Sequence, residues 1–323
     1  MIYERLLRPL LFALDPETAH HFVLAFLRAA GPLLPKPTDT TSRVSVFGLN
    51  FRHRVGLAAG LDKNGIALPA WEALGFSFVE IGTVTAQAQP GNPRPRIFRY
   101  PEQNALINRL GFNNDGAEVI ASRLAELRDR GGWPGIPVGI NIGKSRVTPI
   151  ERAVEDYLFS FRKLRAQADY IALNVSSPNT PGLRELQGGE RLDELLRAIN
   201  AERGNMPLLV KIAPDLEAAA LNELVSICEG NNVSGIIASN TTLDHSAIVR
   251  DEDGGLSGAP LQKKSTAIVR QIANKTKIPI IGCGGIFDAP SAREKIEAGA
   301  KLLQVYTGFI YRGPKLVHEL ARV

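Results

Sequence analysis

Polar side chains that could bind a ligand are concentrated just after short apolar runs of this sequence. The clearest case follows Tyr170-Ile-Ala-Leu, where Asn174, Ser177 and Asn179 appear within six residues, ahead of Pro181-Gly182. Amides and hydroxyls are costly to bury without hydrogen-bond partners. Their concentration at the end of a buried strand therefore indicates a polar ligand rather than packing.

Lysines and further asparagines follow comparable runs elsewhere. Lys63 and Lys211 each lie at the end of such a run, and so do Asn141 and Asn240. Lysine provides positive charge, whereas asparagine offers paired hydrogen-bond donors and acceptors. Because carboxylates and histidines are nearly absent from these positions, the composition indicates a planar, anionic ligand with amide-like edges.

Ser177 admits two chemical interpretations and a structural one. A nucleophilic serine would need a histidine, but Ser177 lies outside any G-x-S-x-G motif and only His245 follows a strand end. A hydroxyl can also accept a proton when water or another hydroxyl relays it. The structural interpretation is a turn residue before Pro178. A metal site is not favoured, because His20 and His21 are adjacent and have no carboxylate cluster beside them.

Glycines gather after the last two runs, at Gly282-Cys-Gly-Gly285 and Tyr306-Thr-Gly308. In parallel barrels the loops after the last two strands often bind a phosphate group. Glycines are also ordinary turn residues. The pattern alone leaves both interpretations open.

Eight short apolar runs, most of them separated by amphipathic helical patterns, must position these groups. The runs are Val55–Gly60, Phe78–Val84, Pro137–Gly143, Tyr170–Ser177, Leu208–Pro214, Gly235–Asn240, Pro279–Gly285 and Leu302–Gly308. Eight strands alternating with helices predict an α/β fold of the (β/α)8 TIM-barrel type, with its active site at the carboxyl ends of the strands. A doubly wound open sheet is the alternative, but its usual early G-x-G-x-x-G turn is missing.

Residues 1–37 are predicted to form a small two-helix extension ahead of a barrel made of residues 38–323. Leucines recur at helical spacing up to Leu14, Asp15-Pro16 is typical of a helix start, and a second apolar helix follows before Pro32. These helices either pack on the barrel flank or form a module for a membrane surface or an apolar ligand. The pattern leaves both open.

The gap between the second and third runs is too long for a single crossover. We therefore expect an inserted hairpin and loop within residues 89–113. This stretch contains Arg94, Arg96, Arg99 and Arg109, with only Glu102 as a nearby counter-charge. The arginines form either a solvated basic face or the entrance to an anionic site.

The composition fits a globular protein of a reducing compartment. The 323 residues carry a net charge of +5, too small and too dispersed to indicate nucleic-acid binding. Neither Cys228 nor Cys283 lies in a C-x-x-C motif. No segment reaches the ~18 apolar residues of a membrane span, and the N-terminus lacks the features of a targeting peptide. We expect a cytosolic protein with no disulfide and no metal.

Taken in order, ten motifs resemble those of class 2 dihydroorotate dehydrogenases, the quinone-linked flavoenzymes of pyrimidine synthesis, and most closely the bacterial members. They lie at Leu57–Lys63, Glu80–Thr85, Pro90–Arg96, Ile107–Asn113, Gly139–Lys144, Asn174–Gly182, Val210–Pro214, Asn240–Thr242, Gly254–Gly258 and Gly282–Gly285. The resemblance covers essentially the whole chain. Class 1 relatives carry Cys at the position of Ser177, so this serine and the N-terminal helices select class 2.

The resemblance implies that the protein binds FMN and oxidises (S)-dihydroorotate to orotate in UMP synthesis. The implied FMN residues are Ala59, Gly60, Thr83, Asn141, Asn174, Lys211, Ser239, Gly258, Gly285, Tyr306 and Thr307. The implied substrate residues are Lys63, Asn108, Arg109, Leu110, Gly111, Phe112, Asn174, Asn179, Asn240 and Thr241. Ser177 corresponds to the catalytic base, which takes a proton from C5 while a hydride passes from C6 to flavin N5. Ser239 stands where Thr is usual, and Asn64 where Asp is common.

The resemblance also implies reoxidation by a membrane quinone through a tunnel between the N-terminal helices, to which His20, Arg99 and Tyr306 correspond. We therefore expect a monomer bound peripherally to the cytoplasmic face of the cell membrane. One alternative is a related flavin barrel that acts on another pyrimidine or uses a soluble acceptor. Another is an inactive membrane-surface binding module.

Overall fold

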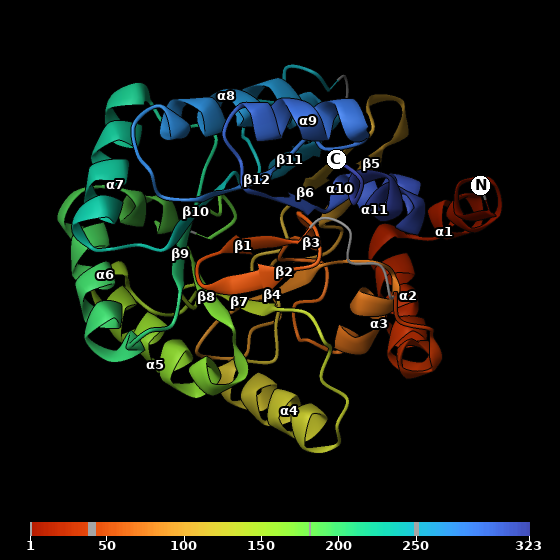
Figure 1. Cartoon of the computed structure of the whole chain (residues 1–323), viewed down its shortest axis with the longest axis horizontal. Helices are drawn as coiled ribbons and strands as arrows, with labels where there is room; N and C mark the ends of the chain where they lie inside the picture. Colours follow the sequence, from red (N-terminus) through yellow and green to blue (C-terminus); the bar gives the residue numbers. More distant parts are fainter. Residues whose placement is uncertain (1, 38–42, 181, 249–251) are drawn as a thin grey trace.

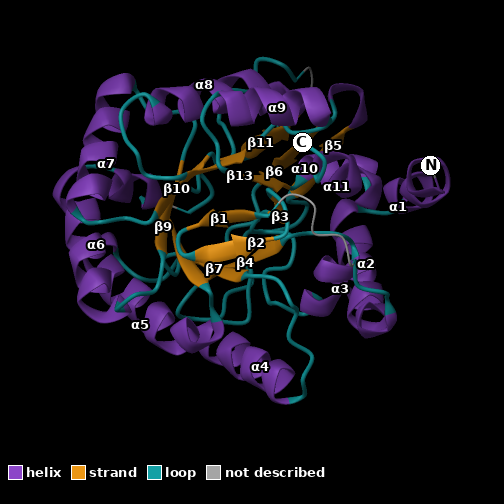
Figure 2. Ribbon diagram, viewed as in Figure 1, coloured by secondary structure: helices purple, strands orange, loops and turns teal. Residues whose placement is uncertain are grey.

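Eight parallel strands form a closed barrel at the centre of the chain (Figures 1 and 2). The computed structural model describes residues 2–37, 43–180, 182–248 and 252–323. The barrel strands are β3 (Val55–Leu57), β4 (Phe78–Val84), β7 (Val138–Ile142), β8 (Tyr170–Asn174), β9 (Leu208–Ile212), β10 (Gly235–Ala238), β12 (Ile280–Cys283) and β13 (Leu302–Val305). Each lies within one of the predicted runs, so the (β/α)8 prediction is confirmed.

Helices surround the barrel on its outer face. They are α3 (Leu68–Ala73), α4 (Ala117–Asp129), α5 (Ala153–Leu164), α6 (Gly189–Arg203), α7 (Ala218–Gly230), α8 (Gln262–Ala273), α9 (Ala289–Glu297), α10 (Thr307–Arg312) and α11 (Pro314–Leu320). Short 3-10 turns are η2 (Gly31–Leu33), η3 (Pro101–Gln103), η4 (Ile150–Arg152), η5 (Arg165–Gln167), η6 (Leu183–Gln187) and η7 (Ala259–Leu261).

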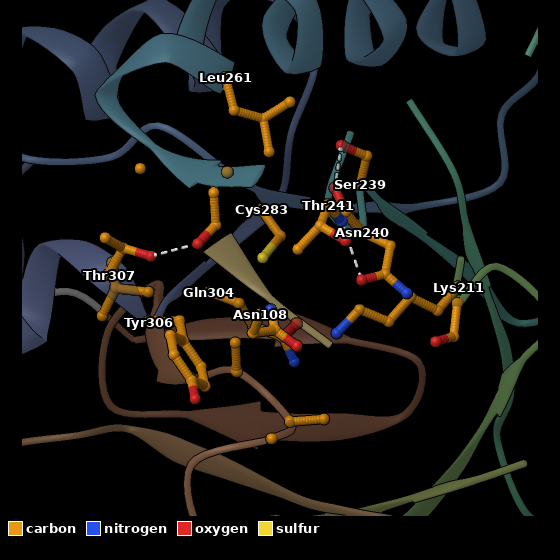
Figure 3. Close-up of a pocket in the computed structure, with 18 of the residues that line it drawn as sticks. Asn108, Lys211, Ser239, Asn240, Thr241, Leu261, Cys283, Gln304, Tyr306 and Thr307 are labelled. Atoms are coloured by element: carbon orange, nitrogen blue, oxygen red, sulfur yellow. Dashed lines mark hydrogen bonds between the residues drawn. The ribbon is translucent and has the colours of Figure 1, made fainter. Parts of the chain in front are cut away.

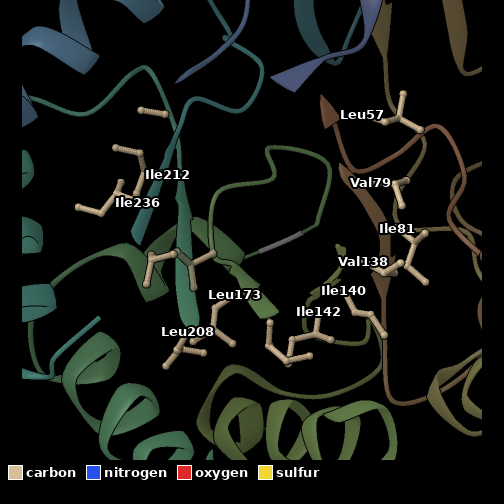
Figure 4. Close-up of a cluster of buried hydrophobic side chains, with 14 of the residues drawn as sticks. Leu57, Val79, Ile81, Val138, Ile140, Ile142, Leu173, Leu208, Ile212 and Ile236 are labelled. Carbon is tan, nitrogen blue, oxygen red and sulfur yellow. The ribbon is translucent and has the colours of Figure 1, made fainter. Parts of the chain in front are cut away.

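Alternation along each strand divides the core into two parts, since successive side chains of a strand point to opposite faces. Ile140 and Ile142 belong to the larger cluster between strands and helices (Figure 4), whereas Tyr170 and Ala172 belong to a smaller inner cluster. The inner space is tight, because a Cβ on Gly139 would lie 2.0 Å from the Tyr170 ring. The Tyr170 ring therefore fills the space beside Gly139 within the barrel.

Two small antiparallel sheets accompany the closed barrel. Strands β1 (Val44–Val46) and β2 (Leu49–Phe51) pair antiparallel, and the Phe51 ring packs edge-on against Phe78 inside the barrel. The predicted insertion is confirmed as the hairpin β5 (Ile97–Tyr100) and β6 (Ala105–Asn108). It gains a third strand, β11 (Gly255–Gly258). This strand was not predicted, because Gly-Leu-Ser-Gly has little strand propensity of its own.

The N-terminal helices are also confirmed. A π-helical turn η1 (Tyr3–Leu7) leads into α1 (Arg8–Ala13), and α2 (Pro16–Ala30) begins at Asp15, whose carboxylate accepts from the Thr18 N–H at 2.8 Å. They lie outside the ring of barrel helices (Figure 1). The predicted boundary between residues 37 and 38 stays a prediction, since 38–42, like Pro181, lie outside the described residues. Among those described, no helix is long and apolar enough to cross a membrane.

Candidate active site

A cavity opens at the carboxyl ends of the barrel strands (Figure 3). It encloses about 970 Å3 of empty space, counting the part open to solvent. Residues predicted for FMN that line it are Ala59, Gly60, Thr83, Asn174, Lys211, Ser239, Gly258, Gly285, Tyr306 and Thr307. Residues predicted for the substrate that line it are Lys63, Asn108, Leu110, Gly111, Phe112, Asn174, Asn179, Asn240 and Thr241, and Ser177 lies among them. The fold therefore brings both predicted sets together in one cavity.

Two predicted residues lie beside the cavity rather than on its wall. Asn141 is fully buried behind Thr83 and Asn174, and hydrogen-bonds to both. The Arg109 guanidinium packs over the Phe98 ring and pairs with Glu252 at 3.1 Å. Asn141 can therefore position wall residues, whereas the Arg109 side chain is engaged away from the cavity.

The amides at the strand ends form one connected network. The Thr83 hydroxyl donates to Asn141 Oδ1 at 2.6 Å, and Asn174 Nδ2 donates to Thr83 Oγ1 at 2.8 Å. Asn240 Nδ2 donates to Ser176 Oγ at 2.9 Å. Buried side-chain networks of this kind fix amide orientation, because each group constrains its neighbour. The cavity wall is therefore preorganised for a ligand with specific hydrogen-bonding edges.

Glu80 supports this network from inside the barrel. It is fully buried and accepts from Asn141 Nδ2 at 2.9 Å and from Gln304 Nε2 at 2.8 Å, and the Lys211 ammonium lies 3.9 Å away. Tyr170 also donates to it, and burial, with the charge of Glu80, raises the Tyr170 pKa well above its ordinary value. Neither Glu80 nor Gln304 was predicted. Each lies between two apolar residues that face the surrounding helices, and this alternation was the signal that its own side chain points into the barrel.

Gln304 also presents an unsatisfied group. Its Nε2 is engaged by Glu80, and its buried Oε1 has no hydrogen-bond partner. Gln304 lines the cavity and is 0% exposed. A buried acceptor left alone costs about 1–3 kcal/mol. A ligand with an N–H edge would satisfy this oxygen.

Ser177 lies on a loop tied closely to its neighbours. Its side chain is buried, and Oγ accepts from the Asn179 N–H at 3.2 Å. Asn179 Nδ2 in turn donates to the Asn108 carbonyl at 3.0 Å, which joins this loop to β6. His245 instead lies against the Gly254 carbonyl, at 3.0 Å from Nε2. These contacts provide no histidine for a hydrolytic triad and leave Ser177 as a hydroxyl facing the cavity.

Arg184, which follows this loop, holds it against the segments that follow β9 and β10. Its guanidinium donates to the carbonyls of Ser176 and Thr241, at 3.2 and 3.4 Å, and pairs with Asp215 at 3.1 Å. One side chain thus links the residue preceding Ser177 to a predicted substrate residue. Sequence reasoning missed Arg184 because it lies in a short 3-10 turn rather than at a strand end.

Lys63 lines the cavity, and its surroundings lower the pKa of its ammonium. Burial lowers the pKa of its ammonium to about 8, and the nearby Arg96 charge adds to this effect. An ammonium in such surroundings is stabilised when an anion arrives beside it. Lys63 is therefore suited to bind a carboxylate.

Glycines shape the end of the cavity that lies away from Lys211 and Asn240. Gly258, Gly284 and Gly285 all have positive φ values, of 105°, 102° and 72°. A Cβ on Gly285 would lie 2.2 Å from Gln262 Cα, so only glycine fits between the loop and α8. Close approach of a backbone to a ligand is a common use of such glycines.

Of the residues predicted for the quinone tunnel, His20 belongs to α2 and Arg99 contacts α1, whereas Tyr306 lines the cavity. Arg99 donates to the carbonyls of Leu11, Phe12 and Leu14, at 3.1 to 3.3 Å, and packs over the Phe12 ring. Burial, followed by the Lys63 charge, lowers the His20 pKa to about 3, so its imidazole is neutral at pH 7. The Tyr306 ring lines the cavity beside Gly60.

The solvated-face interpretation of the arginines is wrong for Arg96. Its side chain is 6% exposed and pairs with the buried Glu17 of α2 at 2.6 Å. Arg94 also pairs with Glu17, at 3.1 Å. The sequence offered no local signal for this contact, because 79 residues separate the partners. The hairpin arginines therefore fasten the N-terminal extension to the barrel.

Metal binding finds no support in the described part of the chain, where no group of three potential ligands occurs. Cys228 and Cys283 are free and buried. Burial raises the pKa of both thiols, that of Cys228 to about 12. Neither is therefore a thiolate at neutral pH.

The comparisons with known proteins identify the family. Residues 41–322 match the family described as dihydroorotate dehydrogenase. The chain belongs to this family. Proteins named dihydroorotate dehydrogenase (quinone) from Gloeobacter violaceus and Methylococcus capsulatus are 52% and 50% identical, over 98% and 100% of this chain and 92% and 99% of theirs. The predicted resemblance to quinone-linked bacterial enzymes is thus confirmed.

The solved structures agree. A dihydroorotate dehydrogenase from Eimeria tenella, described as ligand-free, is 36% identical with a TM-score of 0.89, over 95% of this chain and 93% of that one. A complex of the Eimeria enzyme with ferulenol gives a TM-score of 0.88, over 95% and 90%. The structural similarity therefore covers nearly the whole chain.

Proposed function

We propose that the protein oxidises (S)-dihydroorotate to orotate with bound FMN and transfers the electrons to a membrane quinone. The observation that carries the proposal is the cavity itself, in which Ser177, Lys63 and the asparagine amides converge from separate strand ends. Family membership favours dihydroorotate as the substrate. The proposed step belongs to the synthesis of UMP.

The residues present fit FMN. The unpartnered Gln304 Oε1 suits an N–H edge of a flavin ring, and Lys211 offers a positive charge near the same end of the cavity. The glycine end, with Gly258 and Gly285, suits the phosphate. Ala59, Gly60, Thr83, Asn174, Ser239, Tyr306 and Thr307 would complete the site, with Asn141 behind them. When bound, FMN supplies the two-electron acceptor that takes the hydride from dihydroorotate C6.

The chain's own residues orient the substrate and move its proton. Lys63 would hold the carboxylate, while the amides of Asn179 and Asn240 would read the pyrimidine edge. Asn108, Leu110, Gly111, Phe112 and Thr241 would form the surrounding wall, and Arg109 would act only through its backbone. Ser177 Oγ would take the proton from C5 and release it through water or a neighbouring hydroxyl. Burial of the Ser177 side chain limits competing solvent.

Electron transfer to a quinone is supported by the N-terminal helices. Their outer surface carries the exposed apolar residues Ile2, Leu6, Leu7, Leu10, Leu14, Phe22, Phe26 and Leu33. An apolar patch of this kind marks an interaction surface. We infer that it rests on the lipid surface of the cell membrane, so that a quinone reaches the cavity past His20, Arg99 and Tyr306. A monomer suffices for this arrangement.

The experiment that tests the proposal is anaerobic bleaching. Purified protein should be yellow, and dihydroorotate should bleach the flavin absorbance near-stoichiometrically in the absence of oxygen. Dihydrouracil, which lacks the carboxylate, should bleach it far more slowly. A colourless protein that takes up no added FMN would refute the proposal. Bleaching followed by rapid reoxidation with fumarate or NAD, but not with quinones, would refute the acceptor assignment.

A further inference from the structure

A buried lysine that the proposed chemistry does not use lies behind the glycine end of the cavity. Lys295 of α9 is 0% exposed, and its ammonium donates to the hydroxyls of Ser265 at 2.6 Å and Thr266 at 3.1 Å. None of the described carboxylates forms an ion pair with it. The neighbouring Glu294 carboxylate instead accepts from Gln262 Nε2 at 2.8 Å. Lys295 is therefore a buried cation with hydroxyl partners alone.

Such an arrangement is costly in the isolated chain. Burying an ammonium without a counter-charge is unfavourable, and proteins respond by lowering its pKa. Burial lowers the Lys295 pKa to about 8. A fold needing only volume here could have used methionine, which fills such space without charge. The position therefore suits an anion close by that is not part of the polypeptide.

The contacts of Lys295 lead directly to the cavity. Its stem runs along β12, where a Cβ on Gly282 would lie 2.8 Å from Lys295 Cγ. Its partner Ser265 reaches the Gly284 carbonyl at 2.9 Å, and Gly284 lines the cavity. Two hydrogen-bond lengths thus separate the ammonium from the glycine loop. Figure 3 shows that the cavity extends from Leu261 and Thr307, at this end, to Lys211 and Asn240 at the other.

We propose that Lys295 is the counter-charge for the FMN phosphate and makes the site select FMN over riboflavin. This inference rests on the proposed FMN function. Lys295 does not touch the cofactor; it acts across the Gly284 loop, through the electric field in a poorly hydrated region. A charge pair roughly 8 Å apart at an effective dielectric constant of about 20 changes affinity by about 30-fold. The effect depends on the phosphate, so riboflavin binding should not change.

The test compares two flavins on the full-length protein after removal of FMN. Dissociation constants for FMN and for riboflavin are measured by quenching of flavin fluorescence. For Lys295→Met, FMN affinity should fall about 30-fold while riboflavin affinity stays within about twofold of the wild type. Lys301→Met, which removes an exposed lysine just after α9, should change neither. Lys295→Arg should restore part of the preference for FMN.

The outcomes separate this inference from the proposed function. Equal losses for both flavins, or no loss for either, would overturn the role of Lys295 while leaving FMN as the cofactor. A wild-type protein that binds neither flavin would overturn both proposals. If Lys295→Met fails to fold, Lys295→Gln, which keeps a donor for Ser265 and Thr266, carries the same comparison.

Discussion

The cavity end of the barrel and the N-terminal helix pair are built on opposite principles. At the cavity, polar side chains are buried and bonded to one another, so that Thr83, Asn141 and Asn174 hold one another in place. On the helix pair, apolar side chains such as Leu10 and Phe22 are 69% and 62% exposed. The first surface is preorganised for a small polar ligand, whereas the exposed apolar side chains of the second are left uncovered by the residues that the structure describes. In the proposed function, this contrast assigns substrate chemistry to the cavity and electron delivery to the helix pair.

One buried ion pair joins the two regions. Glu17 of α2 meets Arg96 of the hairpin, and the same arginine donates to the carbonyls of Pro90 and Asn92, at 2.6 and 2.8 Å. The Arg96 charge also contributes to the lowered Lys63 pKa inside the cavity. The residue that fastens the helix pair therefore also influences the pKa of a cavity lysine.

The largest effect is expected at the cavity, from Ser177→Ala. Without its hydroxyl the site lacks the proposed proton acceptor, and general-base contributions are about 10²–10⁴-fold. Flavin reduction by dihydroorotate, followed by stopped-flow absorbance, should slow by at least ~100-fold, while FMN content and orotate binding stay unchanged. Ser226→Ala, on the exposed face of α7, is the matched control. Unaltered reduction would remove Ser177 from the mechanism.

The complementary change targets the helix pair alone. The triple variant Leu10→Ser, Phe22→Ser, Phe26→Ser removes exposed apolar area and should weaken binding to lipid vesicles. Turnover with a long-chain quinone in vesicles should fall by about tenfold or more, while flavin reduction by dihydroorotate is preserved. The control is Val119→Ser with Phe159→Ser, two exposed apolar residues on the barrel helices α4 and α5. Equal loss of both half-reactions would show that the helices have a structural role.

The sequence predicted the helices and strands better than the contacts that their side chains make with one another. The barrel strands are nearly continuous apolar runs, and the groups at their ends follow from topology, so Asn174 and Lys211 could be placed without coordinates. Glu80 was missed because its apolar neighbours indicate only which way the carboxylate points, not which side chains it meets. The pairing of Arg96 with Glu17 was missed for the same reason, since both partners have to be folded before the contact exists. Strand β11 likewise forms only by pairing with β6, which is distant in the sequence.

Breaking the ion pair between Glu17 and Arg96 should affect the stability of the fold more than its chemistry. Burial alone would raise the Glu17 pKa, but hydrogen bonds and charge from Arg96, followed by Arg94, outweigh it, and the carboxyl pKa lies below its usual value. Glu17→Gln leaves Arg96 buried without its counter-charge, and we expect a loss of about 3 kcal/mol in the free energy of unfolding. Chemical denaturation measures this, with Glu126→Gln, which loses only an exposed pair with Arg130, as control.

The Glu17 contribution should also depend on pH. Because the folded pKa is lowered, the stabilisation is present above the unfolded value of about 4.3 and is lost as pH falls through the folded pKa. The difference in unfolding free energy between wild type and Glu17→Gln should therefore shrink below about pH 4. A difference that stays constant down to pH 3 would mean that the pair is not the source of the stability.

The smallest expected effect concerns Lys63 and the charge state of the cavity. Its pKa of about 8 means that the ammonium is charged below that pH and neutral above it. Because the charged form would hold the carboxylate, orotate affinity should be constant from pH 6 to 7 and fall up to about tenfold per pH unit beyond 8. Titrating orotate into the oxidised protein, followed by the flavin spectrum, measures this without turnover. In Lys63→Met binding should be weak throughout, and any remaining slope would belong to the ligand. A wild-type profile that stays flat to pH 9 would place the carboxylate elsewhere, with Lys211 as the next cation of the cavity to test.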